Sequence, residues 1–148
     1  MEWKPISARI ITARFSSKWR NVTVIHCYAP IYSSEEEIKE EFYEELQAVL
    51  DKVSNRDIVI MMGDMNRKVD CDNTGLERVM GQQGAKCKMN ENGELLTDYC
   101  AANELVIGST LFPHKECHKV TWVSPDRKTQ NQIDHIAIAI DGKVHYKM

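Results

Sequence analysis

The chain has 148 residues, a length that provides one hydrophobic core and leaves little room for a second. Hydrophobic residues make up 43% and charged residues 28%, which excludes disorder over most of the length. The formal net charge of −3 excludes attraction of nucleic acid by the field of the whole molecule, so a contact with phosphate needs a local basic surface or a metal ion.

The chain shows no pattern of a membrane or secreted protein. Its longest apolar runs, 58–62 and 136–140, are far too short to cross a bilayer, and residues 1–5 lack the apolar region of a signal peptide. Five cysteines without a Cys-x-x-Cys pair are typical of reduced thiols rather than of a disulfide framework. We therefore expect a soluble protein of the nucleus or the cytoplasm, without membrane contact.

The N-terminal third predicts two strands and a helix. Residues 6–15 and 21–28 are rich in β-formers and flank the turn-like stretch 16–21, which predicts a β-hairpin. Ser34 and Glu37 then have the spacing of a capping box, and apolar residues follow at helical spacing. We predict a helix with Ser34 as its N-cap that ends near Val53, and we interpret its many glutamates as a solvated face.

The segment 58–66 is an apolar, β-branched run that stops at Gly63 and is followed by Asp64 and Asn66. A buried strand that ends there would place both polar side chains at the edge of a sheet. Because side chains at i and i+2 of extended backbone point the same way, we predict that Asp64 and Asn66 face one cleft. A carboxylate beside an amide suits a phosphate with a divalent cation, while an Asx-rich turn is the other interpretation.

The C-terminal half alternates loop, helix and strand. Residues 67–89 predict a long loop, 94–103 a second helix and 105–107 a short strand. A further strand begins at 120–123, and 124–129 have turn chemistry. Residues 132–140 carry apolar side chains on both faces, which predicts an interior strand that is covered on both sides.

Asp134 opens this interior strand. A carboxylate that is buried on one side needs a partner such as an imidazole or backbone amides, so Asp134 is a candidate catalytic group, with a capping aspartate as the other interpretation. His135 points to the opposite face by strand alternation. We therefore predict that His135 packs in the core and takes no part in a site.

Several aromatic and basic residues lie in the predicted loops at strand ends, where an anionic polymer could meet them. For the two tryptophans of this group, burial is the better interpretation because large aromatic rings dominate cores. The residues of the group are Trp19, Arg20, Arg67, Lys68, Trp122, Arg127 and Lys128.

Three blocks occur in a fixed order along the chain. They are Val-Ile-His-Cys-Tyr-Ala-Pro at 24–30, Met-Met-Gly-Asp-Met-Asn at 61–66, and the stretch 121–136 with Trp122 and Ile-Asp-His-Ile. In this order and at these spacings they resemble the endonuclease/exonuclease/phosphatase superfamily. Within it, the likeness is to the apurinic-type endonuclease domain of non-LTR retrotransposons of the RTE or BovB kind. The resemblance covers nearly the whole chain.

The resemblance implies a four-layer α/β sandwich, two mixed β-sheets flanked by helices, with a phosphodiesterase site that depends on Mg²⁺ or Mn²⁺. By that resemblance Tyr28 contacts the scissile phosphate, and Asp64 positions and deprotonates the attacking water and is a metal ligand. Asn66 holds the phosphate, and Asp134 orients a catalytic histidine. Trp122, Arg67 and Asn131 are implied as substrate contacts. The implied partners of such a monomer are DNA and a fused or separately encoded reverse transcriptase.

Two family features have no counterpart in the chain: the metal-binding glutamate of the first strands and the final Ser-Asp-His block. We therefore expect residues 1–148 to be one partial domain whose first and last strands are missing. Its isolated form should nick DNA undetectably and should nick clearly once flanking segments are restored. An inactive remnant that binds a protein is a second hypothesis, and a phosphatase or phosphodiesterase acting on a lipid or nucleotide is a third.

Overall fold

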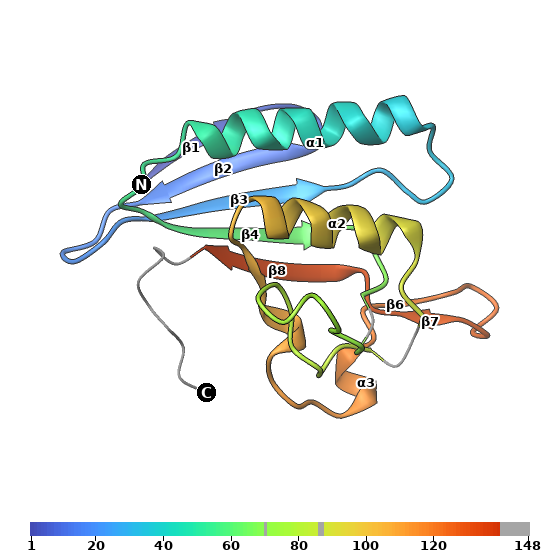
Figure 1. The fold of residues 1–148 in the computed structure, drawn as a ribbon. Coiled ribbons are helices and arrows are strands. Elements are labelled where there is room, and N and C mark those ends of the chain that lie inside the picture. Colours follow the sequence, from blue (N-terminus) through green and yellow to red (C-terminus); the bar gives the residue numbers. More distant parts are fainter. Residues whose placement is uncertain (70, 86–87, 140–148) are drawn as a thin grey trace.

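The computed structural model describes residues 1–69, 71–85 and 88–139 and shows a mixed α/β arrangement (Figure 1). A six-stranded sheet has the order β1-β2-β3-β4-β8-β5, and a two-stranded sheet pairs β6 with β7. The strands of the large sheet are β1 (Glu2–Pro5), β2 (Ile10–Phe15), β3 (Val22–Tyr28), β4 (Ile58–Asp64), β5 (Val106–Ile107) and β8 (Asp134–Ala139). The small sheet consists of β6 (Trp122–Val123) and β7 (Gln130–Asn131).

The helices are α1 (Glu36–Asp51), α2 (Glu91–Ala102) and the short α3 (Glu116–Lys119), with a 3-10 turn, η1, at Gly108–Thr110. The predicted mixed α/β class is therefore confirmed. Within the described part of the chain, no helix is both long and apolar enough to cross a membrane.

The predicted N-terminal hairpin is present as β2 and β3, which pair antiparallel from Ile10 opposite Cys27 to Phe15 opposite Val22. The structure adds β1, which the sequence did not predict and which pairs antiparallel with β2. Residues 2–5 carry a tryptophan, a proline and two charges, so their alternation was too short to indicate a strand.

The helix α1 begins later than predicted. Its N-cap is Glu35, without a side-chain cap, so the predicted capping box with Ser34 as N-cap is wrong. The amide of Ser34 instead donates to the carbonyl of Ile31 in a turn that precedes the helix. Acidic residues at Glu36 and Glu37 complement the helix dipole there, which suffices in place of the box.

The helix α2 begins earlier than predicted, at Glu91. The side chain of Asn90 accepts a hydrogen bond from the amide of Gly93 at 2.8 Å, which makes Asn90 the N-cap. The preceding loop ends at Met89, as predicted, and the helix takes up residues 91–93, which the prediction had left between loop and helix.

The two long helices cover one face of the large sheet (Figure 1). The parallel pair β3 and β4 is joined through α1, and β8 lies antiparallel between β4 and β5, so the predicted interior position of this strand is confirmed. The shared core beneath the helices contains side chains from every layer, among them Ile25, Cys27, Met61, Ala137, Phe42, Leu46 and Leu96.

The opposite face of the large sheet is not covered by these helices. Trp3 is 64% exposed and Tyr28 49%, and Ile11 and Ile136 are 41% and 42% exposed. The expectation that β8 is covered on both sides is therefore wrong within the described residues. Its sequence is apolar on both faces, but helices pack against the Ala137 face alone. We call the uncovered surface opposite the helices, which carries Trp3, Ile11, Tyr28 and Ile136, the open face.

Candidate functional site

Three of the predicted site residues form a row at one end of the open face. Tyr28 of β3 pairs with Asp64 of β4, and Asp64 pairs with Asp134 of β8. Register partners on neighbouring strands project to the same face of a sheet, and strands lie about 4.8 Å apart, so the row spans roughly 10 Å. The structure thus brings Tyr28, Asp64 and Asp134 together from three segments that are distant in sequence.

The backbone around Gly63 fixes the position of Asp64. Gly63 has φ 138°, and a Cβ at this position would overlap the carbonyl group of Cys27 in β3. Past the strand end, the amide of Ala29 donates to the carbonyl of Asp64 at 2.9 Å, and the amide of Met65 donates to the carbonyl of Ile133 at 2.9 Å. Glycine is needed because it allows both the positive φ and the close approach of β3.

Asn66 leaves the sheet and does not continue the alternation of β4. Its φ of 49° is left-handed, its amide donates to Oδ1 of Asp64 at 2.9 Å, and its Nδ2 donates to the carbonyl of Ala29 at 2.8 Å. The Asx turn that we considered as the other interpretation is therefore present. Asn66 stands beside Asp64 through this turn and not through extended strand geometry, and its second side-chain N–H is not used by either contact.

The charge of Asp64 is disfavoured by its surroundings. Burial raises the pKa of Asp64, the amide of Asn66 lowers it, and the neighbouring negative charge of Asp134 raises it again. Asp134 itself is exposed, and its amide and that of Ile133 both donate to Oγ1 of Thr121. A cation placed between the two carboxylates would relieve this repulsion.

Two neighbours of the row were missed in the sequence. Arg9, in the loop before β2, lies with its Cζ 5.5 Å from the centre of the Tyr28 ring and donates from Nη1 to the Tyr28 carbonyl at 3.2 Å. His26 lies two residues before Tyr28 on β3, is exposed, and therefore shares the open face with the row. Strand alternation alone would have placed His26 beside Tyr28, whereas nothing local indicates Arg9.

His135 packs in the core, as predicted. It is 4% exposed, its Nε2 lies 2.9 Å from the Arg67 carbonyl, and its Nδ1 lies 3.1 Å from Oγ of Ser109. Since a carbonyl only accepts, Nε2 carries the proton and Nδ1 accepts from the serine hydroxyl. Burial lowers the pKa of His135, so this imidazole stays neutral and ties β8 to the loop after Asn66.

The three predicted substrate contacts lie in different surroundings. Arg67 is fully buried, with its Cζ 5.2 Å from the centre of the Tyr43 ring of α1, so it is not placed to contact a polymer at the surface. Trp122 is 40% exposed and pairs in register with Asn131 in the small hairpin that leads into Asp134. Trp19 is 87% exposed, and the predicted burial of the two tryptophans is therefore wrong.

The donors of the row fit a hard divalent cation only in part. Asp64 and Asp134 offer the carboxylate oxygens that Mg²⁺ prefers, and Mg²⁺ commonly keeps several waters beside one or two carboxylates. Residues 1–69, 71–85 and 88–139 contain no group of three or more His, Cys, Asp or Glu side chains that could hold a metal ion. A complete protein cage is thus absent from the described residues, and a water-rich site with two carboxylates is what the row can offer.

Comparison with known proteins places this geometry in a known fold. No family model matches the chain. The endonuclease domain of TRAS1, a telomere-specific non-LTR retrotransposon, has a TM-score of 0.57 at 16% identity, over 87% of this chain and 48% of that domain. The chain has the endonuclease/exonuclease/phosphatase fold. An endonuclease/exonuclease/phosphatase family protein from Leptotrichia buccalis C-1013-b is more distant, with a TM-score of 0.49 at 13% identity over 89% of this chain and 42% of that chain.

Among curated proteins, this example of the endonuclease/exonuclease/phosphatase fold is similar to craniofacial development protein 2. The protein of Tragulus javanicus is 38% identical over 128 residues, and that of Bos taurus is also 38% identical over 128 residues. The matches cover 86% of this chain but 22% and 21% of those proteins. The chain therefore spans about a fifth of the length of these relatives.

Proposed function

We propose that this chain carries the phosphate-holding row of a metal-dependent phosphodiesterase that cuts DNA, from a non-LTR retrotransposon or a domesticated relative. One observation carries the proposal: Tyr28, Asp64 and Asp134 stand side by side at one sheet end in a fold shared with a retrotransposon endonuclease domain. We also propose that a reverse transcriptase is the partner of this chain.

Each side chain has a chemical task that its surroundings support. The hydroxyl of Tyr28 donates to a phosphoryl oxygen, and Arg9 beside its ring adds positive charge there. Asp64, whose pKa burial raises, positions the attacking water and accepts its proton. The remaining N–H of Asn66 donates to the phosphate while its other N–H keeps the turn in place.

Asp134 has a different task in this proposal. It is exposed, and an imidazole could approach it, but His135 next to it faces the core. Asp64 and Asp134 would together hold Mg²⁺ or Mn²⁺. A bound divalent cation would neutralise charge that develops on the phosphate during in-line attack.

The test measures nicking of supercoiled plasmid in Mg²⁺ by the polypeptide as its genome encodes it and by residues 1–148. Asp64→Asn is the test variant in each. Asp98→Asn, an exposed carboxylate of α2, is the matched control. We expect nicking by the encoded polypeptide to be lost in Asp64→Asn and retained in Asp98→Asn. Nicking that survives Asp64→Asn would refute the site.

A module that binds a protein without catalysis is the second candidate, and the open face favours it. Its exposed apolar side chains are typical of a surface that another protein covers. This candidate predicts no nicking by either polypeptide in any divalent cation.

A further inference from the structure

A hollow lies at the other end of β3 from the proposed catalytic row. It has a volume of about 690 Å³ and lies between the β2–β3 turn and the turn before β4. Its lining is made of polar and charged residues: Arg14, Ser17, Trp19, Arg20, Asn21, Ser54, Arg56 and Asp57. From Val22 to Tyr28 the strand takes six steps of about 3.3 Å, so the hollow and the row are roughly 20 Å apart.

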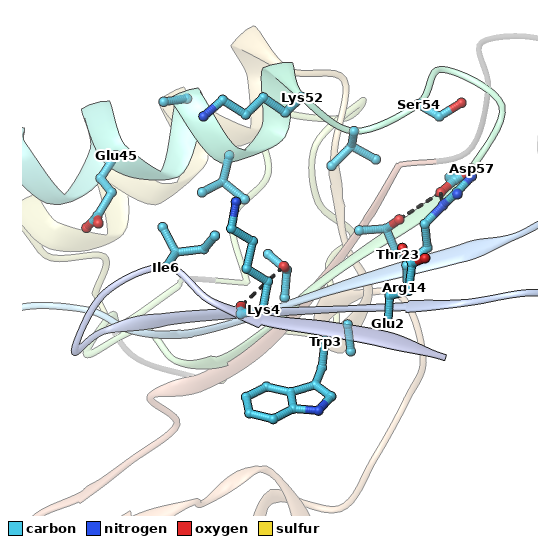
Figure 2. A pocket seen from close by; sticks show the side chains of 15 residues that line it. Glu2, Trp3, Lys4, Ile6, Arg14, Thr23, Glu45, Lys52, Ser54 and Asp57 are labelled. Atoms are coloured by element: carbon cyan, nitrogen blue, oxygen red, sulfur yellow. Dashed lines mark hydrogen bonds and ion pairs between the residues drawn. The ribbon is translucent and has the colours of Figure 1, made fainter.

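The hollow adjoins a groove of about 730 Å³ between α1, the edge strand β1 and its neighbour β2. Arg14, Ser54 and Asp57 line both, and Figure 2 shows Asp57 with Thr23 and Arg14 at the end of the groove. In the same view the charged side chains of Glu45 and Lys52 on α1 lie beside the groove.

The lining of the hollow is positive although the whole chain is negative. Asp57 is the single acidic residue among the described residues that line it, and Arg14 donates to that carboxylate from Nε at 2.7 Å and from Nη2 at 3.0 Å. Thr23 donates a third hydrogen bond at 2.8 Å. The bonded Arg14 lowers the pKa of Asp57, so the pair is neutral as a whole. Arg20 and Arg56 are the other charged residues that line the hollow, and the charge of Arg20 also lowers the pKa of Asp57.

Trp19 is presented to solvent by an ordered turn. The amide of Ser17 donates to Oδ1 of Asn21 at 3.1 Å, and the amide of Trp19 donates to Oγ of Ser17 at 3.2 Å. The indole is nevertheless 87% exposed, and Nζ of Lys18 lies 5.7 Å from its ring centre. Tryptophan side chains are largely buried in most proteins, so the exposure of this indole on an ordered turn is unusual.

A hydrogen bond joins the side chain of Arg20 to the backbone of Arg56. Nε of Arg20 donates to the carbonyl of Arg56 at 3.0 Å, which joins the β2–β3 turn to the turn before β4. Both residues line the same hollow as Trp19. A planar guanidinium next to an exposed ring provides a phosphate contact beside a stacking surface.

We propose that Lys18, Trp19, Arg20 and Arg56, here called the Trp19 site, bind a single-stranded segment of nucleic acid. A base stacks on the indole, and the flanking phosphates face the ammonium and guanidinium groups. A single protruding indole can stack on an unpaired base but not on a base inside a duplex, and an acidic peptide offers no ring to stack. The Trp19 site goes beyond the proposed function because it lies at the end of the sheet away from Asp64.

The experiment measures the anisotropy of a fluorescein-labelled oligothymidylate of twelve nucleotides, titrated with the Asp64→Asn chain without divalent cation. Trp19→Ala should weaken binding about tenfold, within the range for loss of one base–aromatic stack. Trp3→Ala, which removes another exposed indole on the open face, should leave affinity unchanged. Circular dichroism of each variant checks that the fold is intact.

Salt dependence separates phosphate contacts from other losses. Arg56→Gln should reduce the slope of log affinity against log salt by about 0.7, the value for one phosphate contact of a single strand. Arg78→Gln, an exposed arginine elsewhere, should leave the slope unchanged.

Competitors identify the ligand class. Unlabelled single-stranded DNA or RNA should displace the probe, and whichever does so at lower concentration names the natural strand. Equal displacement by duplex DNA or by polyglutamate of the same charge would overturn the proposal, as would equal losses in Trp19→Ala and Trp3→Ala. Nicking by the encoded polypeptide without strand binding at Trp19 would overturn this inference alone. Strand binding at Trp19 by an encoded polypeptide that keeps Asp64 but does not nick would overturn the proposed catalysis alone.

Discussion

Gly63→Ala is expected to destabilise the protein by at least about 3 kcal/mol, because this glycine meets two constraints at once. A non-glycine residue at its φ of 138° is strained, which alone costs about 1–3 kcal/mol. The added Cβ would also overlap the Cys27 carbonyl, so β3 and β4 must move apart at the step just before Tyr28 and Asp64. Gly63→Ala should therefore lower the free energy of unfolding and displace Tyr28 and Asp64 relative to each other.

Gly75→Ala is the matched control for this prediction. Gly75 also has a positive φ, 78°, but a Cβ there meets no atom within 4 Å. Gly75→Ala should therefore lower the free energy of unfolding only by the cost of a positive φ for alanine, about 1 kcal/mol. Urea unfolding followed by circular dichroism measures both free energies of unfolding. If Gly63→Ala costs no more than Gly75→Ala, the close approach of β3 is not what requires the glycine.

Three further predictions concern charge, the open face and thiols. Arg14 lowers the pKa of Asp57, so Arg14→Met should reduce the free energy of unfolding at pH 7. The difference in this free energy between Arg14→Met and the unaltered chain should vanish as acid protonates Asp57. An unchanged difference at pH 2, measured by urea unfolding, would contradict this. Ile136→Thr should change the free energy of unfolding by under about 0.5 kcal/mol and slow aggregation in light scattering, whereas a large loss would mean that Ile136 is covered in solution. Exposed Cys117 should react with a thiol reagent in the native state. Cys100, whose pKa burial raises to about 12, should react only on unfolding. Equal reaction rates of the two thiols in the native state would refute the burial of Cys100.

Local pattern was enough for the interior strand β8 and for His135. Alternation in 132–140 indicates that Asp134 and His135 face opposite sides, and the structure places one in the row and the other in the core. The same rule failed at Asn66. There the chain has already left the sheet, and a left-handed residue in an Asx turn replaces extended backbone.

The burial or exposure of a side chain could not be predicted where it depends on segments distant in the sequence. Arg67 is buried because Tyr43 of α1 lies over its guanidinium, and nothing near residue 67 indicates this. Trp19 is exposed because the turn that holds it projects from the sheet. The start of α1 was misplaced because Ser34 and Glu35 are both acceptable positions, and a turn to Ile31 decides between them.

The position of β8 has a consequence for the order in which the chain can assemble. β8 is the last described strand in sequence but lies inside the sheet, between β4 and β5. During synthesis β1 to β4 can form with α1, and Ile107 of β5 can pair with Met80, but the antiparallel pairing of β5 with β8 needs residues 134–139 to leave the ribosome. The acidic pair of Asp64 and Asp134 is thus completed late, after the hairpins and the parallel crossover have had time to fold.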